Sequence, residues 1–543
     1  MISKARSRWP LPTAVALGIV ILAALWYTTS HSSKPQPPLP VVVNSEGVAG
    51  TYSRINPLYD SFNEVDSDLT ALIFSGLTRL GADGEVLPNL AESWEISSDE
   101  LTYTFHLRPQ VTWHDGEPFT ADDVLFTYSA IQDPNFRGDP ALEELFRSLT
   151  VSKVDDMTVE LRLTQPFAPL LAHLSVGILP AHLLNGLDAN ALYSGPFNQK
   201  PVGTGPFRLA DISSQRAVLD ANSAYHFGEP KLGRFELRFY PDEPSLLKAL
   251  KDGEVRSAFF RSPLDSEDLR YLETLSDRQV LRLPSTTSTV LYFNNAVSPL
   301  QDRTVRQALA YAMDRDHIIA TAVDGQAVRA DSPVPVGTWA YSAVLDRYTY
   351  DPAQAARLLD EAGWTLQANA VRARDGQEMR LSIITNEDPQ RLAIAQAIAA
   401  SWSSLGIPTD VTTQPPTSLL RNFLTPRLFI VALYGFDGGP DPDPYPAYHT
   451  SQARPGGDNL SGFSNPDVDL LLQTARQTSD VAVRLALYRQ FQEVFAGELP
   501  SLPLYQRTFT YVIDKHLQGV GQPVLFDSSS RFCDVREWRT DGG

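Results

Sequence analysis

Three carboxylates lie close together in one stretch of the chain, at Asp437, Asp441 and Asp443. The rings interleaved with them belong to Phe436, Tyr445, Tyr448 and His449. Aromatic walls with a few placed charges are typical of a small-ligand pocket, so residues 433–452 are a candidate binding loop. The same residues also fit a solvated turn, because Asp, Gly and Pro are the commonest turn residues.

The elements around this stretch must position its side chains. The apolar run from Leu428 to Tyr434 is rich in β-branched and aromatic residues and predicts a buried strand that leads into the loop. Two glycines and several prolines follow between Gly438 and Pro446. Each proline removes a backbone donor and fixes φ, so we expect a stiff loop that forms neither helix nor sheet.

Composition restricts the possible functions. A chain of 543 residues with 43% hydrophobic residues has enough material for several domains. Its formal net charge of −19 argues against a nucleic-acid partner, which requires clustered Lys and Arg. The single cysteine, Cys533, cannot close an intramolecular disulfide and is expected to be a small buried hydrophobe. The scattered histidines give no metal-ligand spacing, so we expect neither a metal nor a cofactor.

The N-terminus has the pattern of an export segment. Basic residues precede an apolar run from Leu11 to Tyr27, and no acidic residue occurs before Glu46. We interpret residues 1–29 as a signal or uncleaved anchor and residues 30–41 as a linker. The body would then lie on the extracytoplasmic face of the cytoplasmic membrane, anchored by residues 11–29 or released if the signal is cleaved. No cysteine follows the apolar run, so a lipoprotein is excluded.

The body alternates strand and helix patterns, which predicts an α/β fold. Expected strands are 101–107, 207–209, 234–240, 256–260, 379–385, 408–413 and 501–513. Expected helices are 68–77 with Asp66 as its cap, 121–131 with a Thr120 and Asp123 capping box, 244–252, 302–312, 352–362, 390–405, and one or two within 468–497.

Enzyme motifs are not convincing. His114 and Asp115 are adjacent on a predicted turn with no nucleophile beside them. The glycines of Pro201 to Phe207, PVGTGPF, lead into a strand and lack the lysine of a phosphate loop, so they indicate a tight turn. The sequence contains neither a Gly-x-Ser-x-Gly elbow nor a His-Glu-x-x-His motif, and we predict that the protein is not an enzyme.

Several long blocks resemble one family. These are LAESWEIS, YTFHLR, WHDGEPFTADDV, PVGTGPF, LYFNN followed by DRTVRQALAYAMDR, and DPDPY with HTSQ and GFSNPDVD. Together they resemble the family-5 extracytoplasmic solute-binding proteins of ABC importers, the peptide, oligopeptide and nickel type. The blocks keep the family's order over residues 42–510, nearly the whole body.

The resemblance implies a two-lobed, periplasmic-binding-protein-like α/β fold of type II, cluster C, with an extra inserted domain behind the N-terminal membrane segment. The first lobe would comprise residues 42–90, 201–286 and 506–543, with the inserted domain at 91–200. The second lobe would comprise 287–505, and the segment from Pro284 to Ser298 would carry the crossing between lobes.

The same resemblance implies capture of peptides between closing lobes and delivery to a membrane permease with its ATPase, by a protein that is a monomer. Asp437 is the nearest match to the aspartate that holds a peptide's amino group in relatives, although its spacing to Asp441 differs from the family pattern by one residue. The other candidate ligand residues are Tyr434, Gly435, Phe436, Asp441, Tyr445, Asn63, Glu64, Val65 and Trp339.

Alternatives remain for both site and function. Asp441 and Asp443 would also serve to brace the loop, and Trp113 fits a core position. Arg329 and Arg374 are candidates for a ligand carboxylate. The family resemblance also permits a receptor for a metal chelate or another non-peptide solute, or a sensory or chaperone-like derivative.

Overall fold

The computed structural model describes residues 43–343 and 348–541. The predicted signal or anchor, residues 1–29, and the linker, residues 30–41, lie outside the described residues. Among the residues described, no helix is both long and apolar enough to cross a membrane.

One mixed sheet of 11 strands organises the chain. In spatial order its strands are β18 (Thr409–Gln414), β17 (Leu381–Asn386), β19 (Val431–Asp437), β12 (Arg278–Phe293), β20 (Ser501–Asp514), β11 (Ser257–Phe260), β1 (Val43–Ala49), β10 (Arg234–Tyr240), β9 (Arg216–Ala221) and β8 (Phe207–Ile212), with β13 (Ala327–Arg329) also paired to β20. β1 runs parallel to β10 and β11, and β17 runs parallel to β18 and β19.

The long central strands β12 and β20 connect the two ends of this sheet. They pair antiparallel, but their register shifts between Pro284 and Ser288. Ser285 instead bridges to Leu525. The regular ladder is therefore interrupted inside the segment from Pro284 to Ser298, which is the segment predicted from the family resemblance to cross between the two lobes.

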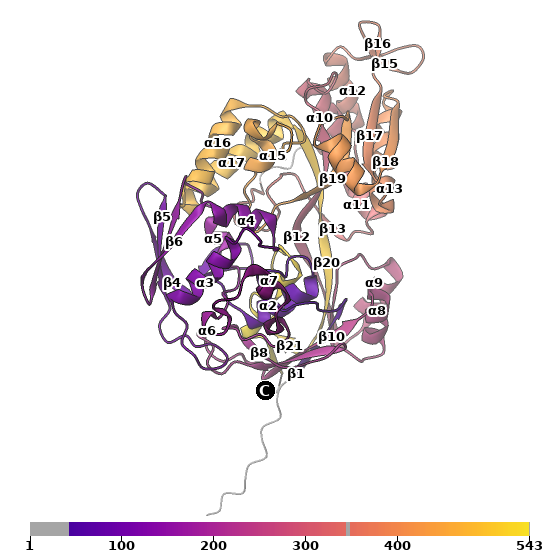
Figure 1. Ribbon diagram of the computed structural model, residues 1–543. Helices are drawn as coiled ribbons and strands as arrows, with labels where there is room; N and C mark the ends of the chain where they lie inside the picture. Colours follow the sequence, from indigo (N-terminus) through magenta and orange to yellow (C-terminus); the bar gives the residue numbers. More distant parts are fainter. Residues whose placement is uncertain (1–42, 344–347, 542–543) are drawn as a thin grey trace, which may run out of the picture. The chain divides into compact units, whose positions relative to one another are not determined.

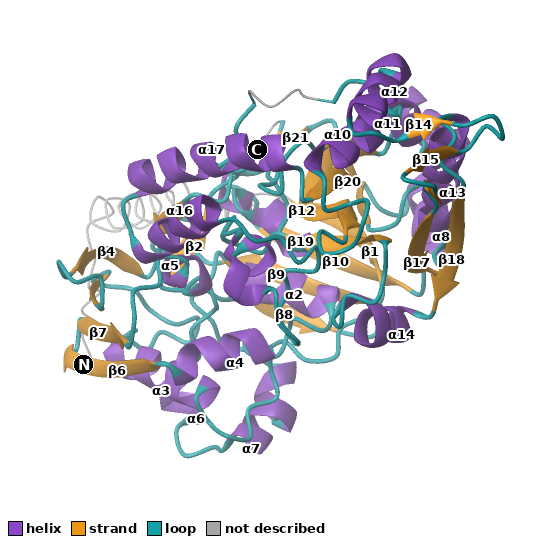
Figure 2. Cartoon of the chain, turned by 90° about the horizontal axis from the view of Figure 1, so that it is seen from above, coloured by secondary structure: helices purple, strands orange, loops and turns teal. Residues whose placement is uncertain are grey.

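Four smaller sheets complete the strand set of the described chain. They comprise β4 (Ala91–Ile96), β5 (Thr102–Leu107), β7 (Thr158–Leu163) and β6 (Leu149–Asp155); β14 (Thr365–Leu366), β15 (Arg372–Arg374) and β16 (Gln377–Glu378); β2 (Thr78–Leu80) and β3 (Val86–Pro88); and β21 (Leu517–Gln518) and β22 (Arg539–Thr540). Figure 2 shows α3 and α4 beside the first of these sheets.

Helices cover the sheets. They are α2 (Glu64–Ile73), α3 (Ala121–Ile131), α4 (Pro140–Arg147), α5 (Leu170–His173), α6 (Ala181–Leu184), α7 (Ala189–Ser194), α8 (Glu243–Lys251), α9 (Ser266–Thr274), α10 (Arg303–Tyr311), α11 (Arg315–Ala322), α12 (Pro352–Glu361), α13 (Pro389–Ser404), α14 (Pro416–Ser418), α15 (Tyr445–Tyr448), α16 (Pro466–Gln477) and α17 (Val481–Glu498). Helices of other types are the 3-10 helices η1 (Pro196–Gln199), η3 (Thr450–Gln452), η4 (Ser528–Phe532) and η5 (Val535–Glu537) and the π-helix η2 (Leu419–Leu424). Figure 1 shows α10 to α13 grouped beside β17.

A large apolar core fixes the strand that carries the candidate loop. Val431 and Leu433 of β19 are fully buried in the same cluster as Ile394, Ile398 and Trp402 of α13. Burying side chains of this size contributes about 1.5–3 kcal/mol each. The strand end that bears Asp437 therefore projects from a rigid base.

Three expectations about local structure need correction. The first helix begins at Glu64 rather than residue 68, because Asn63 is its cap: the Asn63 Oδ1 accepts the N–H of Val65 at 3.0 Å. Asp66 is not the cap, since its carboxylate accepts the N–H groups of Ser53 and Arg54 at 2.7 and 3.0 Å.

The strand before the candidate loop is displaced by three residues. It spans Val431–Asp437, whereas Leu428 is 67% exposed in the turn after η2. Phe436 and Asp437 still pair with β12, so they belong to the strand rather than to the loop. The loop also contains a helical turn from Tyr445, because Pro446 lies in the first turn, where no backbone donor is needed.

Other local predictions are confirmed. Thr120 and Asp123 form the capping box of α3. Gly363 and Gly406 follow α12 and α13 with φ of 83° and 82°, conformations that favour glycine. The region 468–497 forms two helices, α16 and α17.

Candidate functional site

A cavity of about 720 Å³ lies beside the end of β19. Its walls come from α2, β2, α4, α5, the segment around Tyr225, the residues that follow β19, and the C-terminal turns η4 and η5. The volume is within the range of ordinary ligand pockets. Of the residues predicted for the site, Asp437 is the one that lines this cavity, together with Gly439 and Pro440 of the loop that follows β19.

Asp437 accepts hydrogen bonds from two neutral groups of the protein. Its Oδ1 accepts the hydroxyl of Thr286 at 3.1 Å and the N–H of Gly439 at 3.0 Å. Its side chain is exposed, and in the described chain no basic group pairs with it. Thr286 lies where the β12 and β20 register breaks. The carboxylate is thus free to accept hydrogen bonds from a cationic group in the cavity.

Asp441 and Asp443 have partners within the protein. Asp441 is buried and accepts two hydrogen bonds from Arg484, at 2.6 and 2.9 Å. Asp443 accepts the Nε–H of Arg476 at 2.7 Å. Burial alone would lower the pKa of Arg484, but Asp441 and Tyr488 raise it above its ordinary value. These two carboxylates brace the loop, which is the alternative that the sequence left open.

The aromatic residues of the stretch pack against the protein. Tyr445 stacks on His449 with ring centroids 4.1 Å apart, and the Arg476 guanidinium lies 4.2 Å from the Tyr445 ring centroid. Tyr434, Gly435 and Phe436 are half-buried in β19, and Phe436 packs against two apolar clusters.

Asn63, Glu64 and Val65 lie together at the start of α2. Asn63 is occupied as the helix cap, Glu64 forms an ion pair with Arg261, and Val65 is buried. The cavity is instead lined by the next turns of this helix, through Ser67, Thr70 and Ala71.

Trp339 lies in a packed environment away from the cavity wall. Its ring centroid is 5.9 Å from that of Tyr488, and the Arg484 guanidinium lies 5.1 Å from it. Its backbone N–H donates to the carbonyl of Asp83 at 3.0 Å. Arg329 pairs with Asp331 at 3.3 Å, and Arg374 lies over Trp364 at 4.7 Å. Neither arginine lines the cavity.

Sequence reasoning missed Asp60, which lines the cavity and accepts a hydrogen bond from the Thr70 hydroxyl. Burial raises its pKa to about 7, and the nearby carboxylates Asp527 and Asp66 add to the increase, whereas Thr70 opposes it. Because Asp60 closely follows Asn56-Pro57, the sequence predicted only a loop at this position.

The C-terminal wall is fixed by a buried charge cluster. Arg531 donates to Asp68 at 2.6 Å and to Glu46 at 2.9 Å, and all three side chains are fully buried. Tyr511 donates its hydroxyl to Glu46 at 2.6 Å. Burial raises the pKa of Glu46, with Arg531 opposing that increase. Because an unpaired buried charge is costly, this cluster ties η4 to α2 and β1.

Cys533 lines the cavity instead of lying in the core. Trp113, in contrast, is 2% exposed, as its core alternative predicted.

His114 has a structural position: its Nδ1 accepts the N–H of Gly203 at 3.3 Å and its Nε2 contacts the Gly205 carbonyl at 3.1 Å. Burial lowers the pKa of His114 to about 4, so a neutral ring holds this turn.

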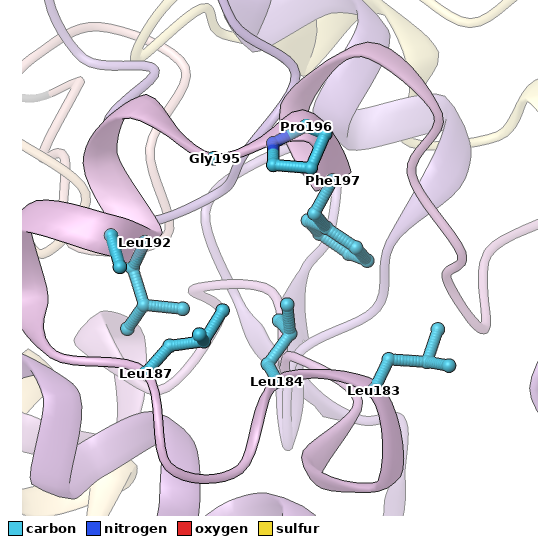
Figure 3. Close-up of a pocket in the computed structure, with 8 residues that line it drawn as sticks. Leu183, Leu184, Leu187, Leu192, Gly195, Pro196 and Phe197 are labelled. Carbon is cyan, nitrogen blue, oxygen red and sulfur yellow. The ribbon is translucent and has the colours of Figure 1, made fainter.

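A second, much smaller pocket of about 130 Å³ lies among α6, α7 and η1. Figure 3 shows Leu184, Leu187 and Leu192 around it together with the ring of Phe197. Its lining residues are of the types Leu, Ala, Gly, Pro and Phe, and no predicted site residue lies there. Across the described ranges, no group of three or more His, Cys, Asp or Glu side chains is arranged to hold a metal ion.

Comparisons with known proteins agree with one another. Residues 85–457 match the bacterial extracellular solute-binding proteins, family 5 (middle). The dipeptide-binding protein of Escherichia coli (strain K12) is 30% identical over 457 residues, which covers 80% of this chain and 83% of that protein.

Solved structures with the same fold include NikZ from Campylobacter jejuni in complex with Ni(L-His), with 29% identity and a TM-score of 0.68. They also include the oligopeptide-binding protein AppA from Bacillus subtilis in complex with a nonapeptide, with 25% identity and a TM-score of 0.65. Each alignment covers 92% of this chain and 100% of the other.

Proposed function

Because the chain belongs to the bacterial extracellular solute-binding proteins of family 5, we propose that it captures peptides and delivers them to the permease and ATPase of an ABC importer. The observation that carries this proposal is the 720 Å³ cavity with the unpaired carboxylate of Asp437 on its wall. A peptide ammonium would form a charge-assisted hydrogen bond with that carboxylate, worth about 1.5–3 kcal/mol. The likeness to dipeptide- and nonapeptide-binding relatives supports the ligand class.

Delivery would depend on two lobes that close over the ligand. In this proposal residues 42–90, 201–286 and 506–543 form one lobe, 91–200 an inserted domain, and 287–505 the other lobe. The separate sheet of β4 to β7 within the inserted stretch supports this division. So does the register shift between Pro284 and Ser288, since an interrupted ladder is a suitable place for bending.

Anchoring through residues 11–29 and a monomeric state stay predictions from the sequence. They would keep the receptor close to its permease on the outer side of the cytoplasmic membrane, where one closed receptor would dock at a time. Release after signal cleavage would give the same binding chemistry without the tether.

Native mass spectrometry of the chain, purified without refolding, tests the ligand class. We expect a series of co-purified masses that fragment as short peptides. A single non-peptide mass, or one that contains a metal, would contradict the peptide assignment and favour a receptor for a chelate or another solute.

A further inference from the structure

The end of helix α16 contacts the proposed inserted domain, which belongs to the first lobe. Figure 1 shows α16 beside α5 and the sheet of β4 to β7. The carbonyl of Arg476, in the last turn of α16, accepts the N–H of Ala168 at 2.8 Å. The last carbonyls of a helix have no partner within that helix. A backbone donor from the inserted domain therefore completes a helix end in the proposed second lobe.

The side chain of Arg476 extends this contact to the candidate loop. Its guanidinium carbon lies 5.1 Å from the ring centroid of Phe167, in the inserted domain, and 4.2 Å from that of Tyr445, in the loop. Its Nε–H donates to Asp443 at 2.7 Å. A guanidinium group over an aromatic face is attracted by the negative face of the ring. One side chain thus contacts both the inserted domain and the loop that follows β19.

Glu100 makes a second contact between the same two parts of the chain. Its Oε2 accepts the N–H of Ser479, between α16 and α17, at 3.2 Å. Glu100 has a φ of 57°, a left-handed conformation that is sterically disfavoured for residues other than glycine. Its turn is closed by the backbone, because the Glu100 N–H donates to the Ser97 carbonyl at 2.9 Å. The turn therefore does not need the carboxylate that reaches Ser479.

The loop and the two helices beside it form one unit. Arg476 of α16 holds Asp443, and Arg484 of α17 holds Asp441. All four residues belong to the proposed second lobe, so these pairs persist when the lobes separate. The contact between Arg476 and Phe167 joins different lobes and is lost when they separate.

We propose that five residues form an interlobe clasp, in which Arg476 is a positioning residue for the ligand loop. They are Glu100, Phe167 and Ala168 on one side and Arg476 and Ser479 on the other, and none of the five lines the 720 Å³ cavity. The inference rests on the proposed function, because it assigns these contacts to the closed arrangement of the lobes. Contacts made only in the closed form raise its population, and the apparent affinity for ligands of that form rises with it. The clasp therefore strengthens the binding of different ligands by the same factor.

Hydrogen–deuterium exchange of the full chain, with no ligand added, tests the clasp. Phe167→Ala removes the ring on the inserted domain and leaves Arg476 with the loop. Glu100→Gly removes the carboxylate and suits the left-handed φ of the turn. Each variant is measured at the other contact: exchange of the Ser479 N–H in Phe167→Ala, and exchange of the Ala168 N–H in Glu100→Gly.

Tyr271→Ala is the matched control. Lys251 lies 5.1 Å from the Tyr271 ring centroid, the same distance as in the Phe167 contact, but both residues belong to the first lobe. We expect each clasp variant to speed exchange at the other contact by about 5-fold, the factor that corresponds to one cation–ring contact. The control should leave both amides unchanged. The amides that pair β12 with β20 should exchange as in the wild type in all three variants.

Unchanged exchange at the other contact would overturn the clasp, because the two contacts would then not open together. If Phe167→Ala also speeds exchange in β12 and β20, its ring supports the fold. Glu100→Gly then decides the question alone, since glycine is favoured at that position of the turn.

Peptide binding separates the clasp from the proposed function. A tetrapeptide library, as free amines and N-acetylated, is added to the wild type and the variants, and bound peptide is measured by native mass spectrometry. We expect both clasp variants to weaken binding of the two forms by the same factor, about 5-fold. A loss confined to one form would overturn the clasp in favour of a direct ligand contact. Binding of no peptide by the wild type would overturn the proposed peptide ligand, while exchange without ligand would still decide the clasp.

Discussion

Two neighbouring carboxylates have opposite environments, although only four positions separate Asp437, at the end of β19, from Asp441 in the loop that follows. Asp441 is buried and receives two hydrogen bonds from Arg484. Asp437 is exposed at the cavity, and its Oδ1 accepts hydrogen bonds from two neutral groups, the Thr286 hydroxyl and the Gly439 N–H. The difference shows that a carboxylate is available to a ligand where the protein has not already neutralised it, whatever its neighbours in the sequence.

The largest effect should come from breaking the buried pair. Arg484→Met leaves Asp441 buried without its partner, so we expect the free energy of unfolding to fall by about 3–5 kcal/mol. Urea unfolding measures this. The control Arg357→Met removes an exposed i,i+4 pair with Glu361 and should cost about 0.5 kcal/mol or less.

Adding Asp441→Leu to Arg484→Met should restore most of the stability, because an apolar pair no longer leaves a buried charge. A loss below about 1 kcal/mol for Arg484→Met alone, against the roughly 3 kcal/mol expected, would contradict the structural role of Asp441.

A carboxyl in the cavity with a raised pKa should make the free energy of unfolding depend on pH. The pKa of Asp60 is about 7 in the folded protein, against 3.8 as its ordinary value. Between those values the folded state holds a proton that the unfolded state has lost. The free energy of unfolding therefore falls as pH rises from about 4 to about 7, by up to about 1.4 kcal/mol per pH unit.

Asp60→Asn should remove this slope while it keeps an acceptor for the Thr70 hydroxyl. The measurement is the difference in free energy of unfolding between wild type and variant, taken from pH 4 to 8. A difference that does not change with pH would show that Asp60 is ionised throughout.

The helix cap gives the next largest effect. Asn63→Ala removes the acceptor for the N–H groups of Val65 and Asp66, and should lower the free energy of unfolding by about 1 kcal/mol. Peptide affinity should not change, because Asn63 does not line the cavity. Weaker peptide binding by Asn63→Ala at unchanged stability would show that Asn63 contributes to the ligand site.

The smallest effect on stability is expected for Asp437, the exposed carboxylate of the two compared. Asp437→Asn keeps an oxygen acceptor for Thr286 and Gly439, so we expect the free energy of unfolding to change by about 0.5 kcal/mol or less. Thermal unfolding of Asp437→Asn and Arg484→Met in one series measures the loss of stability in each variant. A loss as large as that of Arg484→Met would give Asp437 a structural role.

The class of fold could be predicted from sequence, because hydrophobic periods, capping boxes and glycine stops are local signals. Thr120 with Asp123 and the glycines after α12 and α13 are examples. The cap at Asn63 was missed because Asp66 three residues later offers the same chemistry, and only the incoming chain at Ser53 and Arg54 decides between them.

The site was only partly predictable. Asp437 was predicted as a ligand residue from the stretch 433–452, and it does line the cavity, but Asp441 could be classified only after Arg484, 43 positions away, was placed beside it. Arg79 and Arg536 are separated by most of the chain and reach the cavity through β2 and η5, so no spacing rule connects them. Contacts of this kind depend on tertiary packing rather than on local pattern.

The most direct test of the account is calorimetric titration of wild type and Asp437→Asn with one tetrapeptide that co-purifies, in its free-amine and N-acetylated forms. We expect Asp437→Asn to weaken binding of the free-amine form by about 1.5–3 kcal/mol, and to leave the acetylated form unchanged. Equal affinity of the two proteins for the free-amine peptide would contradict the claim that Asp437 receives the ligand's amino group.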